Sequence, residues 1–158
     1  MTIDARRSST AATWADLAAA QPEIAAKGHA LFYRAGAGDA LLATVGPGTP
    51  PRIHPIAIGI VDGGLFAFIL PSAKQRDLDA DGRYALHAYV DAFHPDEFTV
   101  RGRVRGVDAA TRARLAADWP WSVGDAAAYE FLIEDAILAE RASRDDWPPR
   151  YASWRAGR

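Results

Sequence analysis

The sequence contains no cysteine among its 158 residues. Disulfide bonds, thiolate-ligated zinc and cysteine nucleophiles are therefore excluded as sources of stability or chemistry. A chain without cysteine is compatible with a reducing compartment, and we expect a cytoplasmic protein.

The sequence also lacks any apolar run of the about 20 residues that a membrane-spanning helix needs. Its first residues, MTIDARRSST, have no apolar stretch after their charges, so they do not have the pattern of a secretory signal. The formal net charge is only −2 at pH 7, which gives no overall attraction to nucleic acid or to an anionic membrane. We expect a soluble protein that binds neither.

Six segments have the apolar and β-branched composition of strands. They are residues 40–45, 52–61, 65–70, 83–90, 96–108 and 129–142. Helical patterns begin at Trp14, cover residues 22–34 with Pro22 in the first turn, and cover residues 73–81 and 109–119. Thr13 and Asp108 are the predicted N-caps of the first and last of these, and the residues DGG at 62–64 predict a hairpin turn. Gly28 weakens the second pattern, which either stops there or continues to Arg34.

These elements predict a single domain over residues 1–158, mainly β with helical decorations (α+β), built on an antiparallel β-barrel. A helical N-terminal region covers residues 1–35, and its first 12 residues are expected to be a polar leader. The barrel covers residues 40–142, and an aromatic, proline-rich tail covers residues 143–158.

The strand at 52–61 has two unequal faces, because side chains alternate with period two. His54, Ile56, Ile58 and Ile60 form a bulky face that belongs in a core. Pro55, Ala57 and Gly59 form a nearly smooth face, which accepts a flat ligand or packs closely against a helix or a second subunit. Pro55 donates no ladder hydrogen bond, so it is expected at a sheet edge or bulge.

The strand at 96–108 places Arg101, Arg103 and Arg105 on one face. A row of arginines can hold a phosphate or carboxylates, but unpaired arginine is seldom buried. We therefore expect a solvated outer face.

The segment ILPSAKQRDL, residues 69–78, passes from a strand into a helix at Pro71 and Ser72. Ser72 can cap the helix, whose first-turn N–H groups carry partial positive charge. Lys74 and Arg76 add cations at the same place. The pattern is typical either of a capped surface helix or of a site for a phosphate group.

Residues 51–89 and 96–108, together with the closing segment DDWPPRYASWRAGR, resemble the pyridoxamine 5′-phosphate oxidase-like, FMN-binding split-barrel family. The resemblance implies a six-stranded antiparallel split barrel and a homodimer that binds FMN between its subunits. Residues that it places at the FMN are Arg52, His54, Pro55, Ile56, Ile69, Leu70, Ser72, Lys74, Gln75 and, from the other subunit, Trp154 or Arg155. Ser72, Lys74, Gln75 and Arg52 would face the phosphate, and the segment from His54 to Ile56 would line the isoalloxazine. Ile69 and Leu70 would make contacts from the neighbouring strand.

The sequence lacks the C-terminal arginine–histidine pair that closes the substrate pocket of the true oxidase, and Leu70-Pro71 replaces an expected polar pair. The substrate is therefore expected to differ, and relatives of this fold bind F420 or haem instead. Three interpretations follow. The first is an FMN-dependent oxidoreductase that acts on a small-molecule substrate or takes electrons from a donor such as a reduced nicotinamide. The second is a cofactor-binding sensor or storage protein, and the third is a cofactor-free dimeric interaction module.

Because a flavin itself performs the redox chemistry, no side chain is assigned as catalytic. The four histidines, His29, His54, His87 and His94, are the axial-ligand candidates that a haem would require. Their spacing does not match a catalytic metal motif such as HExxH.

Overall fold

The computed structural model describes residues 11–158. Most of the expected polar leader lies outside the described residues, and Ala12 already pairs with Ile133 through two backbone hydrogen bonds. The helices are α1 (Trp14–Ala20), α2 (Pro22–Phe32), α3 (Ala73–Ala80) and α4 (Ala109–Asp118). The strands are β1 (Asp39–Thr44), β2 (Arg52–Ala57), β3 (Gly59–Val61), β4 (Gly64–Ile69), β5 (Arg83–His87), β6 (Glu97–Gly106), β7 (Ala127–Glu140) and β8 (Arg150–Arg155).

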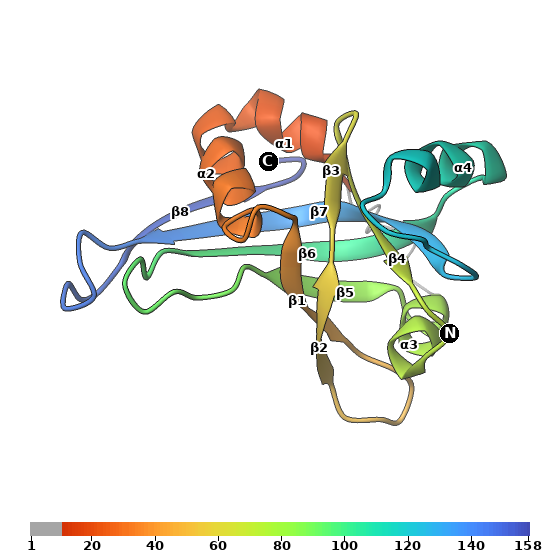
Figure 1. The fold of residues 1–158 in the computed structure, drawn as a ribbon. Coiled ribbons are helices and arrows are strands. Elements are labelled where there is room, and N and C mark those ends of the chain that lie inside the picture. Colours follow the sequence, from red (N-terminus) through yellow and green to blue (C-terminus); the bar gives the residue numbers. More distant parts are fainter. Residues whose placement is uncertain (1–10) are drawn as a thin grey trace.

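The strands form one antiparallel sheet with the order β2-β1-β5-β6-β7-β4-β3, and β8 pairs with β7 (Figure 1). The two ends of this order, β2 and β3, follow each other in the chain with only Ile58 between them. The sheet therefore curls so that its two ends meet at a single connection. The predicted class, mainly β with an antiparallel split barrel and helical decorations, is confirmed.

The described residues form eight strands rather than the expected six. The segment 52–61 is divided at Ile58: up to that residue the segment pairs with β1, and the Ile58 N–H still donates to the Gly38 carbonyl at 3.0 Å, whereas Gly59–Val61 pair with β4. The expected tail contains β8, whose residues pair with positions 135–140 of β7. Its flanking prolines and mixed composition concealed this strand from a pattern analysis.

Helix α2 continues through Gly28 because the missing side chain makes room for Phe98 of β6. A Cβ atom on Gly28 would lie only 2.4 Å from the Phe98 ring. Phe98 is fully buried and contacts Phe32 and Trp14, with ring centroids 5.2 Å and 6.1 Å apart. Glycine therefore weakens the helix locally but allows it to approach the sheet closely.

The local signals for turns and caps are confirmed. Thr13 forms a capping box with Asp16, and the Asp108 carboxylate accepts the Thr111 N–H at 2.7 Å. The hairpin between β3 and β4 turns at Asp62 and Gly63, whose φ angles of 48° and 78° are left-handed. This geometry matches the right-handed twist of the strands that it joins.

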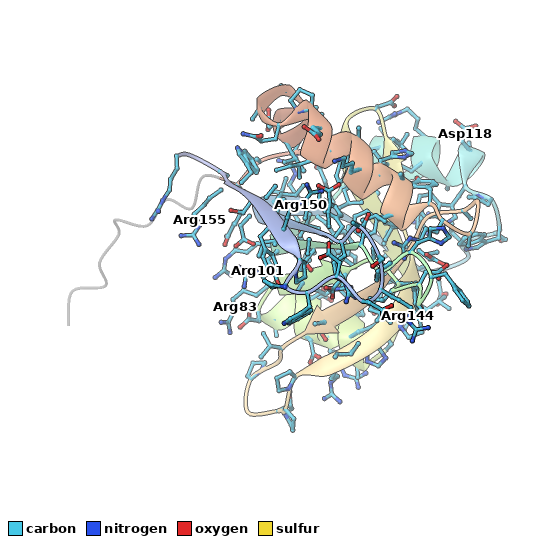
Figure 2. All side chains as sticks on the ribbon, turned by 90° about the vertical axis from the view of Figure 1, so that its left-hand side faces the viewer. Arg83, Arg101, Asp118, Arg144, Arg150 and Arg155 are labelled. Carbon is cyan, nitrogen blue, oxygen red and sulfur yellow. The ribbon has the colours of Figure 1, made fainter. Side chains whose placement is uncertain are left out.

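The outer face of β6 carries the three predicted arginines, and each meets a carboxylate of β7. The pairs are Arg101–Asp135 at 2.8 Å, Arg103–Glu134 at 3.9 Å and Arg105–Glu130 at 2.6 Å. Figure 2 shows Arg101 beside Arg83 on this side of the molecule. The face is exposed as expected, and its arginines also form cross-strand ion pairs with β7.

None of the helices formed by the described residues is long and apolar enough to cross a membrane.

Candidate anion and cofactor site

Ser72 begins helix α3 in the predicted manner. Its backbone is extended, its hydroxyl oxygen accepts the Gln75 N–H at 3.3 Å, and the hydroxyl donates to the Leu70 carbonyl at 2.8 Å. The first turn contains no acidic residue, and Lys74 lies half-buried within it. The start of α3 therefore combines the positive end of a helix with a cation, which favours an anion.

Arg52 of β2 is fixed beside α3 by a buried carboxylate. Asp77, five residues after the Ser72 cap, accepts the Arg52 Nε–H at 3.0 Å and the Thr44 hydroxyl at 2.8 Å through the same oxygen, Oδ2. The Asp77 side chain is only 7% exposed, whereas Arg52 is 36% exposed. Because Asp77 occupies Nε, the two terminal amino groups of Arg52 are left for a second acceptor.

The position of Asp77 depends on Gly46, in the loop after β1. A Cβ atom on Gly46 would lie 2.3 Å from Asp77 Oδ1. The loop backbone therefore closes over the carboxylate, and Asp77, Thr44 and Gly46 together hold Arg52. Sequence analysis missed these three residues. Leu78 could have indicated the burial of Asp77. The one leucine of this short helix is expected to face the core, and the residue next to it is then partly buried as well.

A second contact fixes α3 to the sheet. The Tyr129 hydroxyl of β7 donates to Asp79 Oδ1 at 2.5 Å, and the Gln75 side chain also hydrogen-bonds Tyr129. Burial, together with the nearby Asp79 carboxylate, raises the pKa of Tyr129 well above its ordinary value. Gln75 therefore helps to orient the helix, in addition to any role toward a ligand.

Strand β2 lies at one end of the sheet order, which confirms that Pro55 occupies an edge. Pro55 is exposed, and Ile56 is buried in the core. His54 is half-buried, and its Nε2 atom is buried without a hydrogen-bond partner in the described part of the chain. Such an orphaned nitrogen is uncommon in a protein interior.

The smooth face of this segment has two different environments. A Cβ atom on Gly59 would lie 2.6 Å from the Trp119 ring, so close packing explains this glycine. Pro55 and Ala57, in contrast, are exposed and half-buried. Only this first part of the smooth face is available to a flat ligand.

The two predicted residues at the end of β4 differ in exposure. Ile69 is 1% exposed and packs in the core, so its side chain does not reach the surface. Leu70, the next residue, is 59% exposed. Of the two, Leu70 presents its side chain next to the start of α3.

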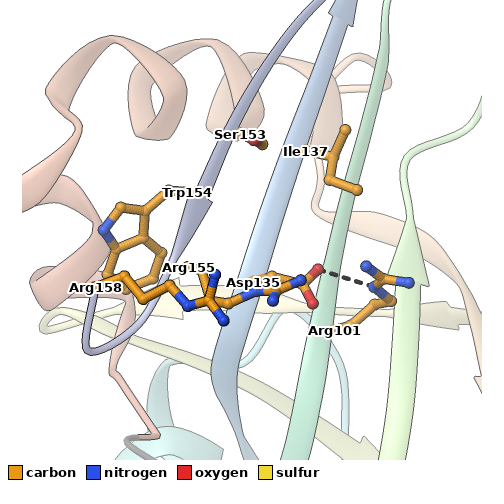
Figure 3. Close-up of a pocket in the computed structure, with 7 residues that line it drawn as sticks. All are labelled: Arg101, Asp135, Ile137, Ser153, Trp154, Arg155 and Arg158. Atoms are coloured by element: carbon orange, nitrogen blue, oxygen red, sulfur yellow. Dashed lines mark hydrogen bonds and ion pairs between the residues drawn. The ribbon is translucent and has the colours of Figure 1, made fainter.

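Trp154 lines a separate cavity of about 320 Å³ on β6, β7 and β8 (Figure 3). Arg101, Asp135, Arg155 and Arg158 also line it, and Figure 3 shows the ion pair between Arg101 and Asp135. Trp154 and Arg155 are the residues of this lining that were predicted at the FMN. Figure 1 shows β8 and α3 on opposite sides of the fold, so one chain does not bring Trp154 to Ser72 and Lys74.

No group of three or more metal-ligating side chains occurs within residues 11–158. His87 contacts Glu97 at 3.5 Å, His94 is 82% exposed in a loop, and His29 stacks on Tyr33. Besides these, His54 is the histidine with an unpaired buried nitrogen.

No protein-family model matches the sequence, and no curated protein matches it. Solved structures are similar in fold. A protein from Clostridium acetobutylicum related to general stress protein 26 of B. subtilis, of the pyridoxinephosphate oxidase family, is 15% identical with a TM-score of 0.59, over 81% of this chain and 95% of that one.

PhzG from Burkholderia lata 383, solved in complex with tetrahydrophenazine-1-carboxylic acid, is 12% identical with a TM-score of 0.61, over 90% of this chain and 93% of that one. HutZ, the haem storage protein of Vibrio cholerae, is 14% identical with a TM-score of 0.54, over 87% and 94% of the two chains. Identities this low establish the fold alone, and this chain has the pyridoxamine 5′-phosphate oxidase-like split-barrel fold.

Proposed function

We propose that this protein is an FMN-dependent oxidoreductase that binds the cofactor at a homodimer interface. The observation that carries the proposal is the guanidinium of Arg52, which is held against α3, the helix that Ser72 and Lys74 begin. Arg52 is held through Nε by the buried Asp77, while Ser72 caps the helix and Lys74 lies in its first turn. A helix N-terminus and two cations on the same helix and its neighbouring strand favour a phosphate group.

The residues present fit a flavin phosphate in charge and in hydrogen-bonding capacity. Arg52 and Lys74 would pair with the phosphate oxygens, and the first-turn N–H groups of α3 would donate to them. His54 would meet the ring system, because its Nε2 atom has no partner in the described chain. When bound, the flavin supplies hydride or electron-pair transfer, and the protein positions it and excludes water.

The proposal includes a second copy of the chain, a small-molecule substrate or reduced nicotinamide donor, and a cytoplasmic location. Trp154 and Arg155 lie away from α3 in one subunit, so they would reach the cofactor from the other. Ile53 on the edge strand β2 is 69% exposed and Leu70 is 59% exposed, which favours coverage of this surface by a partner.

The direct test is titration of purified protein with FMN, followed by flavin fluorescence, in the wild type and in Lys74→Ala. Loss of a charge-assisted contact of about 1–3 kcal/mol predicts an affinity at least fivefold lower in the variant. Lys27, the other of the two lysines, lies on α2 and pairs with Glu23 and Glu140, so Lys27→Ala is the matched control. Equal FMN affinity in wild type and Lys74→Ala would place the phosphate elsewhere.

Turnover is measured with reduced nicotinamide and a quinone or dye as acceptor. Mass spectrometry of the co-purified small molecule distinguishes FMN from F420. A protein that stays colourless after incubation with FMN favours the cofactor-free dimeric module.

Haem binding is a second candidate, favoured by the unpaired Nε2 of His54. HutZ, one of the proteins with a similar fold, is a haem storage protein. The test is haemin titration followed by the Soret band. His54→Ala should abolish a Soret shift that His94→Ala leaves intact, because His94 is 82% exposed in a loop.

A further inference from the structure

A second cavity, of about 220 Å³, lies between the segment after α2, strand β3 and the segment after α4. Its walls include Tyr33, Gly38, Gly59, Asp118, Trp119 and Trp121. None of these residues belongs to the set proposed for the flavin. The volume is below the about 300–1,000 Å³ typical of pockets for drug-sized ligands, so a small headgroup is the appropriate occupant.

Three aromatic rings line this cavity, and two of them are fixed by other contacts. Trp119 packs edge-on against Phe68 at 4.9 Å and rests on Gly59, where a Cβ atom would lie 2.6 Å from its ring. The Tyr33 hydroxyl accepts the Ile60 N–H at 2.9 Å, and one face of its ring is covered by His29. The walls are therefore rigid before any ligand binds.

The third ring, Trp121, stands almost perpendicular to Trp119. The ring centroids are 6.2 Å apart with an interplanar angle of 82°, and Trp121 is 47% exposed. Two indole planes at right angles, with a tyrosine in the same cavity, form the corner of an aromatic cage. Such cages attract a cation to their ring faces and hold it by cation–π interactions.

Asp118 is the one charged side chain among the described residues that line the cavity. The nearest arginines of α4 are engaged elsewhere: Arg112 donates to the carbonyls of Gly124 and Ala126, and Arg114 pairs with Asp62. Figure 2 shows Asp118 on α4, away from the arginines that it labels. The cavity therefore presents a net negative charge beside its aromatic walls.

We propose that this cavity binds a small organic cation with a methylated ammonium headgroup. Aromatic faces combined with a single carboxylate favour a quaternary ammonium over a strongly hydrated metal ion or a neutral apolar group. This binding does not depend on the proposed flavin site.

The test is calorimetric titration of the full chain, without added flavin, with choline and with its neutral isostere 3,3-dimethylbutan-1-ol. The two probes have the same shape and differ only in charge. Choline is expected to bind at least about tenfold more tightly than the isostere, since the cation–π and carboxylate contacts require charge. Equal binding of the two probes, or no binding of choline, overturns the proposal.

Variants then locate the site. Trp121→Ala and Asp118→Asn are each expected to weaken choline binding by about fivefold or more. The matched controls are Trp147→Ala and Asp145→Asn, at exposed positions before β8, which should leave the affinity unchanged. If the controls weaken binding as much as the cage variants do, the cation binds elsewhere and the proposal is wrong. If Trp121→Ala fails to fold, the Asp118→Asn variant and the comparison of choline with its neutral isostere still test the proposal.

Discussion

Two regions of this molecule pair arginine with a carboxylate, and they do so in opposite environments. In the second half of α3, Asp77 meets Arg52; the Asp77 side chain is 7% exposed and also accepts the Thr44 hydroxyl. On the outer face of the sheet, Arg101 meets Asp135 with exposed fractions of 50% and 18%. The first contact is one link of a buried network, and the second is a surface pair.

This difference in burial indicates which arginine is already oriented for binding a ligand. A buried carboxylate with two donors restricts the guanidinium to one orientation, and that preorganisation reduces the entropy lost on binding an anion. A surface pair leaves both side chains mobile and contributes little. The Arg52 network is therefore expected to affect both stability and FMN affinity, whereas the outer pairs should affect stability less and leave FMN affinity unchanged.

The largest effect is expected for Asp77→Ala. Removal of the carboxylate leaves the Thr44 hydroxyl and the Arg52 guanidinium without their acceptor, so the free energy of unfolding should fall by about 2 kcal/mol. FMN affinity should fall about tenfold, because Arg52 is no longer oriented. Urea denaturation and fluorescence titration measure the two effects.

Two controls sharpen this result. Asp77→Asn keeps one acceptor oxygen and should retain part of the stability, about 1 kcal/mol below the wild type. Asp135→Ala removes the carboxylate of the surface pair and should cost less than about 1 kcal/mol, with FMN affinity unchanged if the flavin contacts lie at α3. Equal losses in Asp77→Ala and Asp135→Ala would show that burial does not separate the two regions.

A second, smaller effect is expected for Glu130→Gln. Glu130 belongs to the outer face, but its side chain is only 9% exposed and one oxygen accepts both Nε and a terminal nitrogen of Arg105. Loss of its charge should lower the free energy of unfolding by about 1 kcal/mol. The matched control, Asp135→Asn, should change it less, and denaturation of both variants ranks them. A larger loss of stability in Asp135→Asn would contradict the expectation that the more buried carboxylate contributes more.

The sequence predicted the elements of the Arg52 region but not the network that fixes it. Ser72 as a cap, the helix after it and the strand carrying Arg52 follow from short-range patterns. Asp77 is 25 positions from Arg52 and 33 from Thr44 along the chain, and no periodicity reports such a contact. The fold had to bring β1, β2 and α3 together first.

Long-range packing also explains the other differences. From the sequence alone, the helix could stop at Gly28 or continue to Arg34, and it continues because the missing side chain admits Phe98 from a distant strand. The face containing Gly59 could accept a flat ligand or pack closely, and at Gly59 the Trp119 ring packs against it. In both cases, the role of the glycine is decided by a residue that is remote in sequence. The roles predicted for residues at the FMN remain predictions.

Arg103→Ala should have almost no effect on stability. Its contact with Glu134 is 3.9 Å long, and the two side chains are 53% and 37% exposed. A change within about 0.5 kcal/mol is expected, and addition of salt should leave the difference between variant and wild type near zero, because the pair is already screened. Thermal unfolding at low and high salt checks this, and a loss above about 1 kcal/mol would contradict the classification of these pairs as surface contacts.

The smallest effect is expected at Asp81, which joins the two regions. Asp81 caps the C-terminal end of α3, and its carbonyl accepts from Arg103 of the outer face. Side-chain hydrogen bonds from Arg83 lower the pKa of the Asp81 carboxyl from 3.8 to about 2.

Because this pKa is lower in the folded state, the unfolded chain binds the proton first as the pH falls. The contribution of Asp81 to folding stability is therefore complete above about pH 4 and is lost as the pH falls toward 2. The difference in melting temperature between wild type and Asp81→Asn should therefore be small and constant above pH 5 and should shrink to zero near pH 2. A difference that grows on acidification would mean that the unfolded state, not the folded one, holds this carboxylate ionised.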